Sequence, residues 1–308
     1  MQTRAIGSLR VSIVGIGCNN FGRRIDAAAT DEVVHAALDA GINFFDTADI
    51  YGDGHSEEFL GHALGARRSE ALIATKFGSA YSGGAGGAKP DYIRNAVEDS
   101  LRRLGTDRID LYQLHKPDPV TPIGETLAAL NALVSAGKVR EIGCSNFSVG
   151  QLREARAAAA PGAARFVSVQ NEYSLIQREP EQGVLAECER EGLAFLPYFP
   201  LASGLLSGKY RKGEPAPQGT RLAGSPRAGE ILTDPHLDMV EALAAFARAR
   251  GHSVLELAIA WLLSRRPVAS VIAGATKPEQ VRANAAAAAW TLTPVELIDV
   301  DAILHQHA

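Results

Sequence analysis

Short apolar runs rich in β-branched and aromatic residues alternate along the chain with longer segments of helical periodicity. The helical patterns are clearest at 30–40, 56–64, 91–104 and 123–136. We expect Thr30 to cap the first of these helices, and glycines to end them at positions 41, 65, 105 and 137. The apolar runs are predicted to be strands, at 13–17, 43–46, 72–76, 110–115, 141–145, 168–172, 194–198 and 270–273.

This alternation of strands and helices predicts an α/β fold with a parallel sheet. Eight such steps are the number that closes a (β/α)8 barrel, and we interpret residues 1–308 as one domain of this kind. A doubly wound open sheet is the alternative that the pattern leaves open. The opening segment 1–14 predicts a β-hairpin before the first barrel strand. Two segments interrupt the rhythm, a glycine-rich one at 79–89 and a longer one at 206–235.

The composition is that of an ordinary globular protein, with 46% hydrophobic and 21% charged residues. A formal net charge of −4 argues against nucleic acid or an anionic membrane as the partner. We find no apolar run long enough for a membrane span or a signal peptide. The sparse cysteines, Cys18, Cys144 and Cys188, indicate no disulfide framework. We therefore expect a cytoplasmic protein. We predict no metal site.

Polar side chains stand at the ends of successive predicted strands. In isolation each has an ordinary interpretation, such as a helix cap for an aspartate or a solvated surface position for a lysine. In a (β/α)8 barrel the carboxyl ends of all strands meet at one face, so the joint pattern predicts a single polar cavity. The residues are Asp46, Lys76, His115, Ser145 with Asn146, Gln170 and Tyr198, with Tyr51 one short loop beyond Asp46.

Seven segments carry a family resemblance across nearly the whole chain. They are NFFDTADIYG at 43–52, ATKFG at 74–78, DLYQLHKPD at 110–118, GCSNFS at 143–148, QNEYSL at 170–175, PYFPLASGLLSGKY at 197–210 and VIAGATKPEQVRAN at 271–284. On these segments the chain resembles the aldo-keto reductases, a family of (β/α)8 oxidoreductases. Its second half is similar to the branch that contains the potassium-channel β-subunits and many bacterial reductases.

The resemblance implies NADP(H)-dependent reduction of an aldehyde or ketone, with Asp46, Tyr51, Lys76 and His115 as the catalytic tetrad. Tyr51 would give a proton to the substrate oxygen while hydride passes from the nicotinamide. Free tyrosine has a pKa of about 10, and a nearby Lys76 ammonium is expected to lower it. His115 would hydrogen-bond and orient the carbonyl.

The resemblance also implies a set of cofactor contacts. The nicotinamide end would be held by Ser145, Asn146, Gln170 and, by stacking, Tyr198. The phosphates would be covered by Leu201, Ser203, Lys209 and Arg221, and the adenosine end would meet Gly274, Thr276, Gln280 and Asn284.

Two departures from the family pattern bear on this site. Many members have a Lys-Ser pair and an Arg for the 2′-phosphate where this chain has Gly274, Ala275 and Gln280. We therefore predict NADPH, with NADH as the alternative, and expect Lys277 and Arg221 to replace the lost charge. Phe199 stands beside the stacking tyrosine where a serine is more usual.

The sequence leaves two alternative functions open and excludes one nucleotide-binding motif. The segment GIGCNNFG at 15–22 lacks the third glycine of a dinucleotide-binding fingerprint, because Asn20 occupies that position. A nicotinamide-binding regulatory subunit or redox sensor is the main alternative function. A barrel hydrolase or isomerase without nicotinamide is the third hypothesis.

Overall fold

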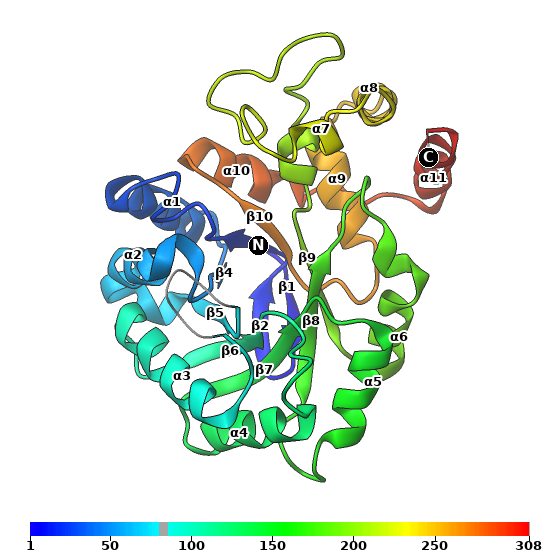
Figure 1. Ribbon diagram of the computed structural model, residues 1–308. Coiled ribbons are helices and arrows are strands. Elements are labelled where there is room, and N and C mark those ends of the chain that lie inside the picture. Colours follow the sequence, from blue (N-terminus) through cyan, green and yellow to red (C-terminus); the bar gives the residue numbers. More distant parts are fainter. Residues whose placement is uncertain (80–85, 308) are drawn as a thin grey trace.

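Eight parallel strands form one sheet in the order β10-β3-β4-β5-β6-β7-β8-β9. The structure is a computed structural model that describes residues 1–79 and 86–307. Figure 1 shows the strands at the centre of the molecule with helices around them. The strands are β3 (Val14–Gly17), β4 (Phe44–Asp46), β5 (Leu72–Phe77), β6 (Ile109–Leu114), β7 (Val139–Ser145), β8 (Phe166–Glu172), β9 (Ala194–Tyr198) and β10 (Val271–Gly274).

The sheet curls into a barrel because its last strand returns to its first. Strand β10 pairs with β3 over four residues. On its other side, Phe195 of β9 accepts a backbone hydrogen bond from Ala269 at 3.0 Å and donates one to Pro267 at 2.7 Å. A doubly wound sheet would instead place the first strand inside the sheet, with strands on both sides in opposite chain order. The predicted (β/α)8 barrel is confirmed, and the open-sheet alternative is wrong.

Helices follow the strands as the periodicity predicted. The predicted first cap is wrong: the N-cap is Asp26, four residues before Thr30, and its side chain accepts from the Ala29 backbone N–H. Thr30 instead donates its hydroxyl hydrogen to the Asp26 carbonyl at 2.7 Å. The barrel helices are α1 (Ala27–Asp39), α2 (His55–Leu64), α3 (Pro90–Leu104), α4 (Ile123–Ser135), α5 (Val149–Ala158), α6 (Val184–Glu191), α9 (Val254–Leu263) and α10 (Pro278–Ala287).

Three further α-helices of the described residues lie outside this ring. The segment predicted as an interruption at 206–235 contains α7 (Ala228–Ile231) and the start of α8 (Asp234–Arg248), and α11 (Pro294–Gln306) packs against α8. Figure 1 shows α7 and α8 outside the ring of barrel helices, at the top of the view, and α8 packs against α9. The glycine-rich segment at 79–89 lies largely outside the described residues. No helix in the described part of the chain is long and apolar enough to span a bilayer.

The predicted N-terminal hairpin is present and closes one end of the barrel. Strands β1 (Thr3–Ile6) and β2 (Leu9–Ser12) pair antiparallel around a turn that begins at Gly7 with a φ of +54°. Ile6, Leu9 and Val11 are buried against inward-facing residues of the barrel strands, such as Phe44. The hairpin therefore fills the amino end of the barrel and leaves the carboxyl end for the polar side chains.

Candidate functional site

A buried ion pair lies at the carboxyl end of the barrel. Asp46 ends β4 in register with Ala74 of β5, so Lys76, two residues farther along, points to the same face. The Lys76 ammonium donates to Asp46 Oδ2 at 2.6 Å and to the Thr47 carbonyl at 2.8 Å. Both side chains are almost completely buried. Burial alone would lower the pKa of Lys76, but the Asp46 carboxylate, with the hydrogen bonds to Asp46 and Tyr51, outweighs it and raises that pKa, so the ammonium stays charged.

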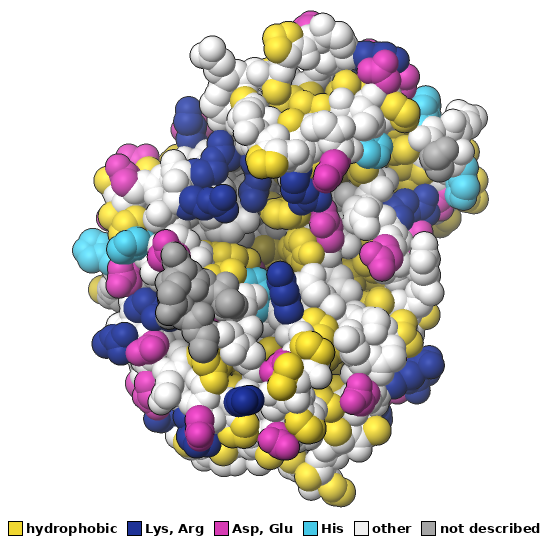
Figure 2. Space-filling model, viewed as in Figure 1, with side chains coloured by type: hydrophobic (Ala, Val, Ile, Leu, Met, Phe, Trp, Pro, Cys, Tyr) yellow, Lys and Arg dark blue, Asp and Glu magenta, His cyan; other side chains and the backbone are white. Residues whose placement is uncertain are grey.

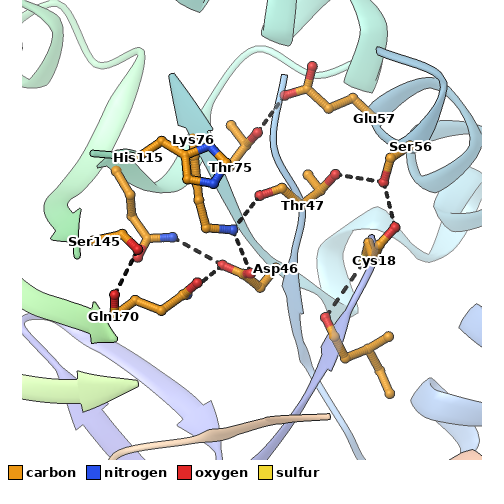
Figure 3. Close-up of polar contacts among 12 residues, drawn as sticks. Cys18, Asp46, Thr47, Ser56, Glu57, Thr75, Lys76, His115, Ser145 and Gln170 are labelled. Atoms are coloured by element: carbon orange, nitrogen blue, oxygen red, sulfur yellow. Dashed lines mark hydrogen bonds and ion pairs between the residues drawn. The ribbon is translucent and has the colours of Figure 1, made fainter. Parts of the chain in front are cut away.

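Two glutamine amides complete the surroundings of Asp46. Gln113 and Gln170 donate to its Oδ1 at 3.1 and 2.9 Å. Gly143 makes room for this arrangement, because a Cβ there would lie 2.5 Å from the Ser168 hydroxyl and 3.3 Å from Gln113 Cγ. Sequence reasoning missed Gln113, although its place two residues before His115 was a signal that both face the barrel interior. Figure 3 shows the contacts of Asp46 with Lys76 and Gln170.

Tyr51 and His115 lie above this pair and line the cavity described below. Their ring centroids are 5.9 Å apart at an interplanar angle of 81°, an edge-to-face contact. The Lys76 ammonium lies 5.0 Å from the centroid of the Tyr51 ring. Burial, with the charges of Lys76 and Lys116, lowers the pKa of His115 to about 3. His115 is therefore a neutral imidazole at physiological pH, and it can donate a hydrogen bond without carrying a charge.

The protonation of Tyr51 differs from the expectation based on Lys76 alone. Burial raises the pKa of Tyr51 above its ordinary value, and the Lys76 charge and hydrogen bond oppose that rise without reversing it. The direction of the lysine effect is as expected, but desolvation of the phenolate is larger. Tyr51 therefore holds its proton at neutral pH, the state required of a proton donor.

The polar residues at the ends of β7, β8 and β9 are bonded to one another. The Tyr198 hydroxyl donates to Asn146 Oδ1 at 2.8 Å, and Asn146 Nδ2 donates to the His115 carbonyl at 3.0 Å. The Ser145 hydroxyl donates to the Gln170 carbonyl at 2.7 Å. Asn146 has a φ of +63°, a conformation uncommon for residues other than glycine. Among residues with a Cβ, asparagine is one of those that adopt this left-handed region most readily.

These residues surround one large cavity of about 1080 Å³. Figure 2 shows the hollow near the middle of one face, with Lys and Arg side chains at its rim. Fifteen of the sixteen predicted site residues line this cavity. The exception is Lys76, which is completely buried. Ser207, which sequence reasoning missed, also lines the cavity, whereas the exposed Lys277 does not. A cavity of this volume is at the upper end of the range for small-molecule and cofactor sites.

The segment after β9 forms one wall and has an unusual backbone. Phe199, Ala202 and Ser203 all have φ between +45° and +58°. The Phe199 ring contacts the edge of Tyr198, and the guanidinium carbons of Arg221 and Arg227 lie 4.8 and 5.5 Å from its centroid. Phe199 therefore makes cation–π contacts with two arginines beside the cavity. This role could not be inferred from the sequence, in which Phe199 stands where a serine is more usual.

The start of α10 forms the opposite part of the rim. Gln280 Oε1 accepts from the Thr276 backbone N–H at 2.7 Å and from its hydroxyl at 3.2 Å. Asn284 Nδ2 lines the same region, is buried, and has no hydrogen-bond partner among the described residues. A buried amide without a partner costs free energy that a ligand could recover. The cations, the free amide and the helix N-terminus together fit the phosphate and adenosine portions of a nicotinamide dinucleotide.

A second buried network connects β5, the strand that carries Lys76, with helices α2 and α3. The Thr75 hydroxyl donates to Glu57 Oε1 at 2.5 Å, and Arg103 Nε donates to Glu57 Oε2 at 2.7 Å (Figure 3 shows the Thr75–Glu57 contact). Asp49 lies close to this network; its backbone N–H donates to the Lys76 carbonyl, and its Oδ1 has no partner among the described residues. Burial and the charge of Glu57 raise the pKa of Asp49 to about 7, against the opposing charge of Arg103.

This environment predicts a pH-dependent stability. The folded chain keeps the Asp49 proton up to about pH 7, whereas the unfolded chain loses it near pH 4. The unfolded state therefore binds fewer protons in this window, and the free energy of unfolding falls as pH rises through it. We expect Asp49→Asn to remove that part of the decline and to stabilise the protein above pH 7 by about 2–4 kcal/mol. Urea unfolding at several pH values measures this, and an unchanged pH dependence would contradict it.

Known proteins resemble this chain over almost its whole length. The model of the aldo/keto reductase family matches residues 13–305. The aldo-keto reductase YhdN of Bacillus subtilis is 36% identical, with 96% of this chain and 91% of that protein covered. A probable voltage-gated potassium channel subunit beta of Oryza sativa is also 36% identical, with 92% and 90% covered.

Solved structures agree with the sequence comparison. The glycerol dehydrogenase AKR11B4 of Gluconobacter oxydans superimposes with a TM-score of 0.88 at 34% identity, covering 100% of this chain and 96% of that one. The aldo-keto reductase AKR11C1 of Bacillus halodurans gives a TM-score of 0.82 at 33% identity, covering 98% and 96%. The chain is an oxidoreductase of the (β/α)8-barrel type, and it belongs to the aldo/keto reductase family.

Proposed function

We propose that this protein reduces aldehyde or ketone carbonyls to alcohols with NADPH, and that Tyr51 is the general acid. The observation that carries the proposal is the placing of Tyr51 and His115 at the cavity wall, directly above the buried Lys76–Asp46 ion pair. The arrangement offers a carbonyl oxygen two hydrogen-bond donors that are both uncharged before reaction. A bound reduced nicotinamide supplies the hydride.

Each tetrad member has a distinct task in this mechanism. Tyr51 and His115 bind the carbonyl oxygen, and Tyr51 transfers its proton as negative charge develops there. The Lys76 ammonium stabilises the tyrosinate that remains, since its charge lowers the cost of ionising the phenol. Asp46 keeps Lys76 charged and in place through the 2.6 Å hydrogen bond.

We assign the remaining predicted residues to the cofactor. Ser145, Asn146 and Gln170 would hold the nicotinamide carboxamide, with Tyr198 against the ring; their present hydrogen bonds to one another keep these groups in place. The phosphates would lie against the segment after β9, at Leu201, Ser203, Lys209 and Arg221. The adenosine end would lie near the start of α10, at Gly274, Thr276, Gln280 and Asn284.

The alternative is a nicotinamide-binding regulatory subunit or redox sensor. The relative from Oryza sativa, whose name describes a potassium channel subunit, is the observation that favours it. The chemistry of the intact tetrad favours the enzyme, because a sensor needs to bind the cofactor but does not need a positioned proton donor.

Turnover of a panel of aldehydes and ketones with NADPH and with NADH tests the proposal. The panel should include glyceraldehyde and dihydroxyacetone, since one structural neighbour is named as a glycerol dehydrogenase. We expect oxidation of NADPH that depends on the carbonyl compound. Tight NADPH binding without turnover across the panel would instead support the sensor.

A preference for NADPH over NADH predicts that Arg221 contacts the 2′-phosphate. Its guanidinium lines the cavity, and it forms no ion pair with a carboxylate among the described residues. Burial, together with the charges of Arg24 and Arg23, lowers its pKa, which indicates a cluster of cations that an added phosphate would relieve. Hydrogen bonds to charged groups contribute about 1.5–3 kcal/mol. We expect Arg221→Met to lower kcat/KM for NADPH roughly 10- to 100-fold and to change that for NADH about threefold or less.

Lys277→Met is the matched control, because Lys277 is an exposed cation near α10 that does not line the cavity. Equal losses with both cofactors in Arg221→Met would contradict a contact with the 2′-phosphate.

A further inference from the structure

The lining of the cavity is more basic than the protein as a whole. The chain has a formal net charge of −4. Among the described residues that line the cavity, however, the only acids are Asp46 and Asp53, and Asp46 is already neutralised by Lys76. Against these stand five cations: Arg23, Arg24, Lys116, Lys209 and Arg221.

Four of the five cations gather on one side of the barrel. Lys209 and Arg221 belong to the segment after β9, and Arg23 and Arg24 to the loop after β3, which pairs with β10. Arg24 donates to the Gly219 carbonyl at 3.1 Å and so joins the two segments. This side is the one assigned above to the phosphates and adenosine of the cofactor.

Lys116 stands apart from that group. It follows β6, which lies four strands from β10 and three from both β3 and β9 in the barrel order. It is next to His115, and consecutive Cα atoms are about 3.8 Å apart. Lys116 therefore lines the cavity beyond the reacting groups, on the side away from the phosphate-binding cations.

The charge of Lys116 has no partner among the residues that the structure describes. Among the described residues no carboxylate forms an ion pair with it, and no hydrogen bond from its ammonium is present. Asp118, the nearest acid in the sequence, accepts instead from the backbone of Ala88 and Val120 and from the Thr121 hydroxyl. The ammonium does act within the cavity, because its charge is one of the causes that lower the pKa of His115.

We propose that Lys116 determines substrate specificity by binding an anionic group, a carboxylate or a phosphate, carried by the carbonyl substrate. The substrate would place its carbonyl oxygen at Tyr51 and His115 and its anionic group at the neighbouring Lys116 ammonium. Carbonyl and anion then belong to one small molecule, separated by a few bonds. This inference rests on the proposed reductase function and names the substrate class for that site.

The test uses matched pairs of aldehydes with saturating NADPH. Succinate semialdehyde is compared with butanal, and glyceraldehyde 3-phosphate with glyceraldehyde, so that carboxylate and phosphate are distinguished. The quantity measured is the ratio of kcat/KM for the charged and the neutral member of each pair. We expect this ratio to exceed about 10 in the wild type for at least one pair and to fall with added salt, because Lys116 is exposed and the charge of an exposed group is screened.

Two variants and one control complete the experiment. Lys116→Met should lower the ratio about tenfold, mainly through KM for the charged aldehyde, and Lys116→Glu should bring it below one. Lys138→Met removes the same charge from a lysine that pairs with Glu98 at the amino end of β7, far from the cavity, and should keep the wild-type ratio.

The outcomes separate this inference from the function on which it rests. If neutral aldehydes are reduced but the wild-type ratios are near one, or Lys116→Met leaves them unchanged, Lys116 is a solvated surface lysine and the inference alone is overturned. If no aldehyde of either kind is reduced while NADPH still binds, the reductase proposal fails and this inference fails with it.

Discussion

Replacing Tyr51 by phenylalanine should lower kcat for carbonyl reduction about 10²- to 10⁴-fold, the range attributed to a positioned general acid. The change removes one oxygen atom. The phenyl ring can keep its edge contact with His115 and its place near Lys76. The loss should therefore appear in kcat, whereas the dissociation constant of NADPH, measured by fluorescence titration, should stay within about threefold of the wild type.

The pH dependence of the wild type provides an independent check of this role. Burial keeps the pKa of Tyr51 above its ordinary value, and the pKa of His115 is about 3. Neither group should titrate between pH 5 and 9, so the rate of carbonyl reduction should be flat there. The reverse oxidation of an alcohol needs the tyrosinate, and its rate should rise about tenfold per pH unit in the same range. A bell-shaped reduction profile centred near pH 7 would contradict the assignment.

The barrel could be predicted because its signals are local and repeated. A short apolar run indicates each strand, and a hydrophobic period of 3.6 residues indicates each helix. Residues close together in the sequence are therefore enough to predict these elements. Closure followed from the number of units. The predicted cap at Thr30 failed for an equally local reason, because Asp26 lies one turn earlier and its side chain accepts from the helix backbone.

The candidate site was predictable to the extent that strand ends converge. The barrel brings Asp46, Lys76 and His115 together without any information on side-chain geometry. The pattern of strand ends predicted that these residues lie together, and the family resemblance then implied the catalytic role of each.

What could not be predicted are the contacts that depend on how helices pack against the sheet. Arg103 reaches Glu57 across 46 positions of the chain, and Glu57 in turn accepts from Thr75. No spacing rule relates these three residues, since their meeting depends on the packing of α2 and α3 on β5. The same holds for Phe199, whose contacts with two guanidinium groups come from the fold of a long segment.

Breaking the buried pair of Asp46 and Lys76 should lower both the stability and the activity of the protein. Asp46→Leu leaves the Lys76 ammonium in a site that is almost completely buried, and Lys76→Met leaves the carboxylate there. Removing one partner of a buried ion pair typically costs about 3–5 kcal/mol, because the remaining charge is neither solvated nor paired. We expect each single variant to lose stability in this range and to lose at least about 10²-fold in kcat.

The double variant Asp46→Leu/Lys76→Met tests whether the pair exists for stability or for chemistry. Two apolar side chains leave no buried charge, although Gln113 and Gln170 still lose their acceptor on Asp46. The double variant should therefore recover about 2 kcal/mol relative to either single variant, measured by urea unfolding. Its activity should stay as low as that of Lys76→Met, because no ammonium remains to stabilise the tyrosinate. Additive losses of stability would show that the two charges are not coupled, and recovered activity would show that Tyr51 does not depend on Lys76.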